Sequence, residues 1–306
     1  MKLSTRLAAF AAVTMIAAAC GGAGASSAPT QAAATTAAAT TAASEAPASA
    51  TAEAIAPPTS LITPGKLVDC VDIEYPPMEY FASSDVTDPN QAVGFDVDGA
   101  KAAAAKLGLT IEIKNTGFDA LIPELQAGRC DIVWSALYVS DKRLQVADAT
   151  PYMSTGHVVM VPAGNPKAIK SPDDLCGKTI SIQSGGVVEQ AANAQSKKCT
   201  DAGKQAITIQ GYKLVADEMQ QIVLGRVDAV WETDSAVSDW MLKNPGKYEV
   251  GYAFPRTDTY GVYYGKGKTD VGTAFAAALK ALKADGTLDG IATKYQIDPA
   301  TLEPIK

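Results

Sequence analysis

The sequence predicts an α/β protein of two similar lobes, each an open sheet of mostly parallel strands covered by helices. Two observations support this prediction. Short apolar runs typical of buried strands alternate with helical segments from residue 66 to residue 296. The segments 118–137 and 216–234 also repeat one order: a helix, a Gly-Arg pair, an aspartate and a strand containing tryptophan. Parallel strands joined by helices form right-handed crossovers, so each half can build its own sheet.

The N-terminus has the features of an export signal. Lys2 and Arg6 precede an apolar run at 7–19, which is too short to span a bilayer and is typical of a signal peptide. Cys20 follows three alanines and precedes two glycines, a pattern that resembles the bacterial lipobox. The resemblance implies a signal peptide at 1–19, cleavage before Cys20 and a diacylglyceryl group on its sulfur. Ordinary secretion without a lipid is the alternative.

Residues 20–60 consist almost entirely of Ala, Thr, Ser, Gly and Pro. Such a segment has little apolar surface to offset the entropy of ordering, so we expect a disordered tether. The rest of the chain, roughly 245 of 306 residues, is long enough for two medium lobes with separate cores.

The charge of the chain limits its partners. The formal net charge is −7; without Lys2 and Arg6, 24 basic residues stand against 33 acidic ones, which gives −9. A mildly acidic surface without a basic run argues against a nucleic-acid partner. The chain has one histidine, His157, and no Cys-x-x-Cys pair, so we expect no metal site and no cofactor.

Four cysteines remain after export, and in an oxidising compartment an even number favours disulfides. Four cysteines allow three pairings. Cys70 lies in one predicted strand and Cys130 opens another, whereas Cys176 and Cys199 bracket a separate unit. We therefore predict the pairs Cys70–Cys130 and Cys176–Cys199.

The first half of the folded region contains a candidate anion site. A helix at 118–126 leads to 130–137, a nearly continuous apolar run typical of a strand covered on both faces. Ser140 is predicted to cap the next helix and to place Arg143 in its first turn. A helix N-terminus beside a guanidinium can hold a carboxylate. The other predicted elements are strands at 66–72 and 109–115, a helix at 95–107 and an extended run at 150–162.

The second half repeats the alternation of strands and helices. A predicted strand at 178–183 leads through Gly185 and Gly186 to a helix at 187–199. Further strands are predicted at 205–212, 226–232 and 248–254, and helices at 216–224, 233–244 and 271–296 with a break at Gly286. We expect lobe 1 to comprise 61–161 plus 259–306 and lobe 2 to comprise 162–258. Ligand would bind in the cleft where the C-terminal strand edges face each other.

Eight motifs occur in order from residue 71 to residue 295: VDIEYPPMEY, GFDVDGAKAAAAKLG, FDALIPELQAGRCDIV, SDKRLQVADATPYMSTG, DDLCGKTISIQSGG, LGRVDAVWETDSA, YGVYYGKG and KADGTLDGIATKY. Together they resemble the family 3 extracellular solute-binding proteins of amino-acid ABC importers. The resemblance implies the type II periplasmic-binding fold, whose lobes close like a venus flytrap about two crossover strands. It also implies an extracytoplasmic monomer that passes a small zwitterion to an ABC permease. The lipid on Cys20 would hold the protein on the outer face of the cell membrane.

The resemblance implies ligand-binding residues in lobe 1. Tyr75 matches the aromatic residue that stacks on the ligand side chain, and Phe118 matches the apolar residue that covers it. Arg143 matches the arginine that binds the α-carboxylate in a bidentate pair. The strand-end positions that offer groups to the α-amino and α-carboxylate groups are Ser135, Ala136 and Tyr138.

In lobe 2, the resemblance implies a turn and an acidic residue. Gly185, Gly186 and Val187 match the turn whose amides bind the carboxylate. Asp234 best matches the acidic residue that receives the α-ammonium. Because this segment carries one residue more than is usual, Thr233 and Glu232 are alternatives.

The sequence departs from the family pattern at hydroxyl positions. Tyr138 stands where serine or threonine is usual, and Gly185-Gly186-Val187 stands where Gly-Thr-Thr is usual. These changes leave the ligand open. A dehydratase of the prephenate or arogenate type and a sensory protein that presents ligand to a receptor are the alternative functions. No Ser-His-Asp or Cys-His arrangement supports an enzyme, so we predict a binding protein.

Overall fold

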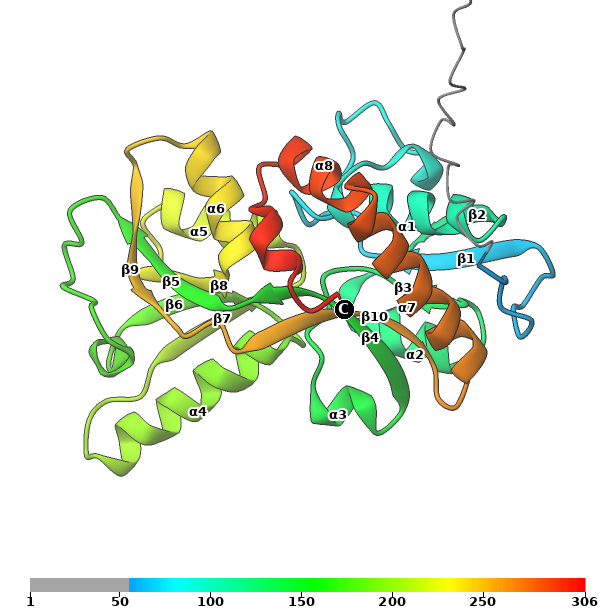
Figure 1. Ribbon diagram of the computed structural model, residues 1–306. Coiled ribbons are helices and arrows are strands. Elements are labelled where there is room, and N and C mark those ends of the chain that lie inside the picture. Colours follow the sequence, from blue (N-terminus) through cyan, green and yellow to red (C-terminus); the bar gives the residue numbers. More distant parts are fainter. Residues whose placement is uncertain (1–54, 306) are drawn as a thin grey trace, which may run out of the picture. The chain divides into compact units, whose positions relative to one another are not determined.

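The computed structural model describes residues 55–305. Cys20, the expected signal peptide and most of the expected tether lie outside the described residues. Within 55–305, every helix is too short or too polar to cross a membrane. The described chain contains two five-stranded sheets, one for each lobe (Figure 1).

The sheet of lobe 1 has the strand order β2-β1-β3-β10-β4. β1 pairs in parallel with β2 and β3, whereas β10 pairs antiparallel with β3 and β4. Its strands are β1 (Lys66–Val71), β2 (Thr110–Asn115), β3 (Ile132–Val133), β4 (Ala147–Thr155) and β10 (Asp258–Gly265). Its α-helices are α1 (Phe95–Lys106), α2 (Leu121–Gln126), α3 (Asp141–Leu144), α7 (Thr269–Ala284) and α8 (Thr287–Lys294).

The sheet of lobe 2 has the order β7-β6-β8-β5-β9, with β6 parallel to β7 and β8 and with β5 antiparallel to β8 and β9. Figure 1 shows α4 on one side of this sheet and α5 and α6 on the other. Its strands are β5 (His157–Pro162), β6 (Thr179–Gln183), β7 (Thr208–Tyr212), β8 (Ala229–Thr233) and β9 (Tyr248–Ala253). Its helices are α4 (Val187–Asp201), α5 (Val215–Val223) and α6 (Asp234–Lys243).

The two sheets share one topology, which confirms the predicted fold class. β3 and β8 occupy the same central place, and each follows a helix, α2 or α5, as the repeated segments 118–137 and 216–234 predict. The sheets are mixed and not mainly parallel. The antiparallel pairings all involve β4, β5, β9 and β10, the strands through which the chain passes between the lobes.

The first passage between the lobes lies earlier than expected. Gly156 separates β4 from β5, and β5 pairs with two strands of lobe 2, so the boundary expected at 161/162 falls at the end of a lobe 2 strand. The sequence is extended through both strands, and a single glycine marks the change. The second passage, residues 254–257 between β9 and β10, lies just before the expected return at 259.

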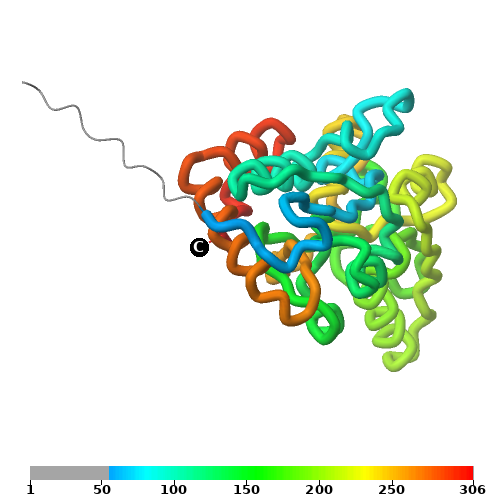
Figure 2. The backbone as a smooth tube through the Cα atoms, turned by 90° about the vertical axis from the view of Figure 1, so that its right-hand side faces the viewer, coloured from blue at the N-terminus to red at the C-terminus, as the bar shows by residue number. Residues whose placement is uncertain are grey.

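Aromatic side chains fill the core of lobe 1. Trp134 and Tyr152 are fully buried with ring centroids 5.3 Å apart, and Phe95 stacks on Tyr152 at 6.0 Å. The helices α1 and α7 pack together, and Figures 1 and 2 show α7 beside α1. The C-terminal segment therefore completes the lobe that the N-terminal segment begins.

Both predicted disulfides are present. Cys70–Cys130 joins β1 to the segment between α2 and β3, with Cα atoms 5.8 Å apart. Cys176–Cys199 ties the start of lobe 2 to α4, with Cα atoms 5.5 Å apart. Each disulfide lies within one lobe, so neither restrains the movement of one lobe relative to the other.

Residues 55–62, which we name the entry segment, lie on lobe 1. The backbone N–H groups of Thr59 and Ser60 donate to Asp270 Oδ2 at 2.8 and 2.9 Å, at the first turn of α7. Ile55 packs against the core. Residues 55–60, which the sequence assigns to the expected tether, are therefore held on lobe 1, where they find apolar and hydrogen-bonding partners.

Candidate ligand-binding site

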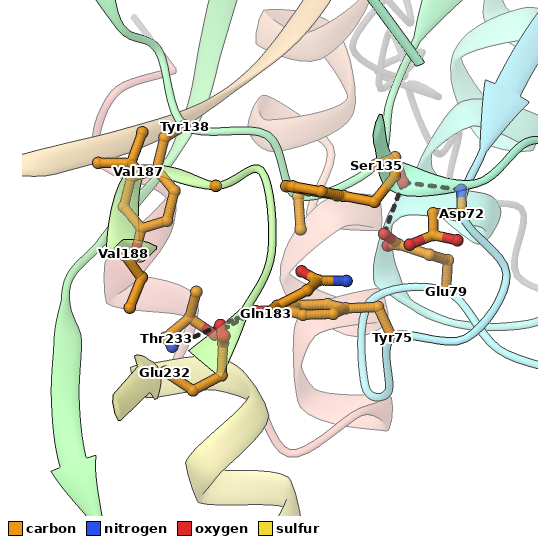
Figure 3. A pocket seen from close by; sticks show the side chains of 13 residues that line it. Asp72, Tyr75, Glu79, Ser135, Tyr138, Gln183, Val187, Val188, Glu232 and Thr233 are labelled. Atoms are coloured by element: carbon orange, nitrogen blue, oxygen red, sulfur yellow. Dashed lines mark hydrogen bonds between the residues drawn. The ribbon is translucent and has the colours of Figure 1, made fainter. Parts of the chain in front are cut away.

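A small pocket lies between the two lobes (Figure 3). It lies beyond the C-terminal ends of the parallel strands, where open α/β sheets bind their ligands. Asp72 follows β1, Ser135 follows β3, and Glu232 and Thr233 end β8. Lobe 1 contributes Asp72, Tyr75, Glu79, Phe118, Ser135, Ala136 and Tyr138 to its lining. Lobe 2 contributes Gln183, Gly186, Val187, Val188, Glu232 and Thr233.

The wall of lobe 1 is a fixed network around Ser135. Its Oγ donates to Glu79 Oε1 at 2.7 Å and accepts the N–H of Asp72 at 3.0 Å, as Figure 3 shows. The N–H of Ala136 donates to Asp96 Oδ2 at 2.6 Å. Ala136 has φ = +41°, in the left-handed region that residues with a Cβ rarely adopt. Strained residues of this kind cluster at functional sites, where the surrounding structure holds them.

Two tyrosines of lobe 1 contact lobe 2. The hydroxyl of Tyr75 donates to Glu232 Oε1 at 2.9 Å and also hydrogen bonds to Thr233 Oγ1. The hydroxyl of Tyr138 donates to the carbonyl of Gly156 at 2.9 Å, at the first passage between the lobes. Both side chains are about 5% exposed. The two tyrosines therefore connect the binding wall of lobe 1 to lobe 2 and to the hinge, the name we give to Gly156 and residues 254–257, where the chain passes between the lobes.

Arg143 lies outside this pocket, in an adjoining groove. Ser140 caps α3 as predicted, and its Oγ accepts the N–H of Arg143 at 3.4 Å. The guanidinium donates from Nη1 to the carbonyl of Tyr138 at 3.0 Å and lies 5.7 Å from the centroid of the Phe118 ring. Phe118 and Val187 line both the groove and the pocket, so the two spaces adjoin.

The glycine turn also spans the two spaces. Gly186 lines the pocket, Gly185 lines the groove, and Gly185 has φ = +88°, which glycine adopts freely. The N–H of Gly185 donates to Glu189 Oε2, within the same helix start, at 2.7 Å. Gly186 is the N-cap of α4, which begins at Val187, so the first amides of a 15-residue helix point from this turn.

Asp234 does not line the pocket. Its Oδ1 accepts from Thr155 Oγ1 at 3.0 Å, and its Oδ2 lies 2.6 Å from Arg256 Nε. It begins α6 beside the strands that connect the lobes. The two alternatives from the sequence, Glu232 and Thr233, are both in the pocket and almost fully buried.

Carboxyl groups dominate the polar lining of the pocket. Burial raises the pKa of Asp72 to about 7, with a further contribution from the charge of Asp119. Burial also raises the pKa of Glu79 and of Glu232. Asp72 Oδ2 and Glu79 Oε2 are buried without a donor. None of the thirteen lining residues is basic, so the pocket offers a ligand hydrogen-bond acceptors and carboxyl groups that a bound cation would favour in their ionised form.

Sequence reasoning missed Asp72, Glu79, Gln183 and Val188 as lining residues. Asp72 could have been found, since it directly follows β1 and the ends of neighbouring parallel strands meet at one edge. Gln183 is the last residue of β6 and is accessible to the same argument. Glu79 and Val188 carry no such signal.

Within residues 55–305, no cluster of three or more His, Cys, Asp or Glu side chains is arranged for a metal ion. His157 lies away from the pocket, at the start of β5. Its Nδ1 accepts from Trp231 Nε1 at 2.6 Å, and its ring stacks on Phe254 with centroids 4.1 Å apart. Burial lowers the pKa of His157 to about 4, so the imidazole is neutral at physiological pH.

Comparison with known proteins places this geometry in context. Residues 67–298 match the family described as bacterial extracellular solute-binding proteins, family 3. The L-cystine-binding protein TcyJ of Escherichia coli is 29% identical over 233 residues, 76% of this chain and 82% of that protein. The arginine-binding protein ArgT of Corynebacterium glutamicum is 28% identical over 258 residues, 80% of this chain and 79% of that protein. A solved structure of an ancestral arginine-binding protein bound to arginine has 31% identity and a TM-score of 0.67, covering 76% of this chain and 98% of that one.

Proposed function

The chain belongs to the family 3 bacterial extracellular solute-binding proteins, and we propose that it captures an amino acid whose side chain carries a positive charge. Its general role is that of the extracytoplasmic amino-acid-binding component of an ABC importer. The proposal adds to this role the charge of the ligand side chain. One observation supports it: three carboxyl groups and no basic group line the pocket between the lobes.

Asp72 Oδ2 and Glu79 Oε2, which lack donors, make a cationic ligand energetically favourable. A buried acceptor without a donor costs about 1–3 kcal/mol, and more when the group is charged. A guanidinium or ammonium brought to Asp72 would supply the missing donors and favour the ionised carboxylate. An acidic ligand side chain would add a like charge in a desolvated space. The lining therefore favours cationic over acidic side chains.

The carboxylate of the ligand would face the adjoining groove. The guanidinium of Arg143 and the first amides of α4 are positively polarised groups near Phe118 and Val187, which line both spaces. We assign Arg143 and the Gly185–Val187 turn to the α-carboxylate, with Ser135, Ala136 and Tyr138 forming the strand-end wall. Tyr75 and Phe118 would flank the side chain.

For the α-ammonium we favour Glu232 over Asp234. Glu232 lines the pocket and is 2% exposed, whereas the carboxylate of Asp234 is paired with Arg256 at the hinge. Asp234 would then contribute to binding indirectly, by bracing the strands about which the lobes move.

Residues of both lobes form hydrogen bonds that would hold the lobes closed over a ligand. Besides Tyr75, Glu74 of lobe 1 accepts the N–H of Val215 at 3.0 Å and a bond from Gln183 Nε2 at 3.2 Å, both in lobe 2. Ligand that binds one lobe first would shift the equilibrium toward this closed arrangement. We further propose a monomer, anchored by a lipid on Cys20, that binds without chemical turnover.

Calorimetry tests the proposal. The purified protein is first unfolded and refolded to remove any ligand that co-purified with it. The panel is L-arginine, L-lysine, L-cystine, L-glutamine and L-glutamate. We expect L-arginine or L-lysine to bind most tightly and L-glutamate not to bind. If L-glutamate bound most tightly, the proposal of a cationic ligand would be refuted. If no amino acid of the panel bound, amino-acid capture itself would be refuted. Conversion of prephenate or arogenate by the same sample would refute the absence of turnover.

A further inference from the structure

Three successive residues at the end of β3 are each held by a different buried carboxyl group. Trp134 N–H donates to Asp69 Oδ1 at 3.0 Å, Ser135 Oγ to Glu79 Oε1 at 2.7 Å, and Ala136 N–H to Asp96 Oδ2 at 2.6 Å. The three carboxyl groups come from β1, from the turn after it and from the first turn of α1. We name residues 134–136 the strand end; Ser135 and Ala136 line the pocket.

No cation neutralises these carboxyl groups. Asp69, Glu79 and Asp96 are at most 1% exposed, and within residues 55–305 no lysine, arginine or histidine forms an ion pair with them. Each keeps one oxygen without a donor: Asp69 Oδ2, Glu79 Oε2 and Asp96 Oδ1. Three ionised carboxylates so close together in a dry core would repel each other strongly.

Glu79 and Asp96 accept hydrogen bonds from two successive residues, Ser135 and Ala136, and each keeps a buried oxygen without a donor. Two carboxylate oxygens are both acceptors, so only a proton held between the two side chains would satisfy both of them. From this geometry we propose that Glu79 and Asp96 share one proton at neutral pH and that the protonated pair positions the strand end for ligand binding. As a statement about the ligand site, the proposal rests on the proposed function.

The surroundings of the pair are consistent with a bound proton. Asp69 and Asp72 face it from β1 and its end, and the hydroxyl of Tyr152, from β4, donates to Asp96 Oδ2 at 2.7 Å. Burial raises the pKa of Asp96 to about 7, and burial together with the charge of Asp96 raises the pKa of Glu79. Neighbouring groups thus supply one neutral donor and two further acids, and no competing base.

The strand end needs this support because Ala136 adopts φ = +41°. A residue with a Cβ disfavours that conformation, and the bond from its N–H to Asp96 holds it there. Loss of the shared proton would place two like charges in contact beneath the strand end. The expected result is a wall that loosens as the pH rises.

The test compares the protein with Glu79→Gln. The glutamine oxygen can still accept from Ser135, and its amide gives Asp96 a donor that cannot titrate. Asp98→Asn, on the same helix but at the surface in a pair with Lys294, is the matched control. Asp96→Asn is the mirror variant: its amide oxygen can accept from Ala136 and its N–H can reach Glu79.

The first readout needs no ligand. Infrared spectroscopy above neutral pH should show the carbonyl band of buried protonated carboxyl groups in the parent and in Asp98→Asn, and Glu79→Gln and Asp96→Asn should each lose part of its intensity. Thermal unfolding adds a second readout. A carboxyl group with a raised folded pKa makes stability fall as the pH rises from the unfolded value, about 4, to the folded value. In Glu79→Gln, the melting temperature should fall less steeply with rising pH than in the parent.

The second readout is the dissociation constant of L-arginine from neutral to alkaline pH. The parent should lose about tenfold in affinity relative to Glu79→Gln, the effect of one pK unit of coupling. Titration of the ligand affects both proteins equally, so the difference between their profiles reports on the pair. Identical profiles would overturn the positioning role, and a carboxyl band of unchanged intensity in Glu79→Gln and Asp96→Asn would overturn the shared proton. If L-arginine binds neither protein, the proposed function fails, and the infrared and thermal measurements still show whether Glu79 and Asp96 share a proton.

Discussion

Asp72→Asn separates the charge of the pocket from its shape. The substitution keeps the size of the side chain and leaves the backbone bond from residue 72 to Ser135 intact. Asp72 is 5% exposed, lines the pocket and has one oxygen without a donor. A ligand cation at this position gains a hydrogen bond to a charged group, worth about 1.5–3 kcal/mol, in place of a neutral one worth about 0.5–1.5. The difference, about 1–1.5 kcal/mol, corresponds to a loss of roughly five- to thirteenfold in affinity.

The assay is calorimetry with L-arginine and L-citrulline, which have nearly the same shape but differ in side-chain charge. The parent protein should prefer L-arginine, and Asp72→Asn should lose most of that preference. Asp85→Asn, an exposed aspartate of the same lobe, is the control and should bind like the parent. An unchanged ratio between the two ligands in Asp72→Asn would refute the assignment of Asp72 to the ligand side chain.

The same site predicts a pH dependence on the acid side. With the pKa of Asp72 raised to about 7, the carboxyl group is increasingly protonated below that pH. A cation binds the ionised form, so binding L-arginine must release the proton. Affinity should therefore fall as the pH drops below about 7, by at most about tenfold per pH unit, and this fall should disappear in Asp72→Asn.

Three further predictions concern other parts of the protein. Arg143→Ala should weaken L-arginine binding by more than about tenfold in calorimetry, because a charge-assisted bond to the α-carboxylate is lost; unchanged affinity would remove Arg143 from the site. Replacing Cys176 and Cys199 with serine should cost about 2–4 kcal/mol of unfolding free energy in urea titrations, without changing the affinity of the folded protein. Gly94→Ala should destabilise lobe 1 by at least about 3 kcal/mol, since Gly94 has φ = +130° and an added Cβ would lie 2.1 Å from Met78 O; a normal melting temperature would contradict this.

The sequence was sufficient to predict the architecture because hydrophobic periodicity and the internal repeat involve many positions along the chain. Each strand that ends at the pocket is marked by an apolar run, and the Gly-Arg pairs before β3 and β8 align the two halves. The first passage between the lobes was placed too late, because Gly156 alone separates two extended segments. Glycine has many other uses in a chain, so it is a weak signal by itself.

The candidate site was harder to predict because the direction of a side chain depends on register. In the segment 231–234, a shift of one residue exchanges a pocket-lining side chain for one at the hinge, and the sequence left Glu232, Thr233 and Asp234 open. The structure places the first two in the pocket and the third against Arg256. The buried carboxyl groups of lobe 1 were also hidden, since acidic residues are usually exposed and sequence alone does not show their burial.

The entry segment has a mechanical consequence. Thr59 and Ser60 tie the chain to Asp270, so a pull from the N-terminal side is transmitted first to lobe 1 and α7. Within residues 55–305, the backbone passes between the lobes at Gly156 and at residues 254–257. If the chain is anchored at Cys20, lobe 1 stays close to the anchor and lobe 2 moves relative to it about the hinge. A transporter that docks this protein would then sense ligand mainly as a change in the position of lobe 2.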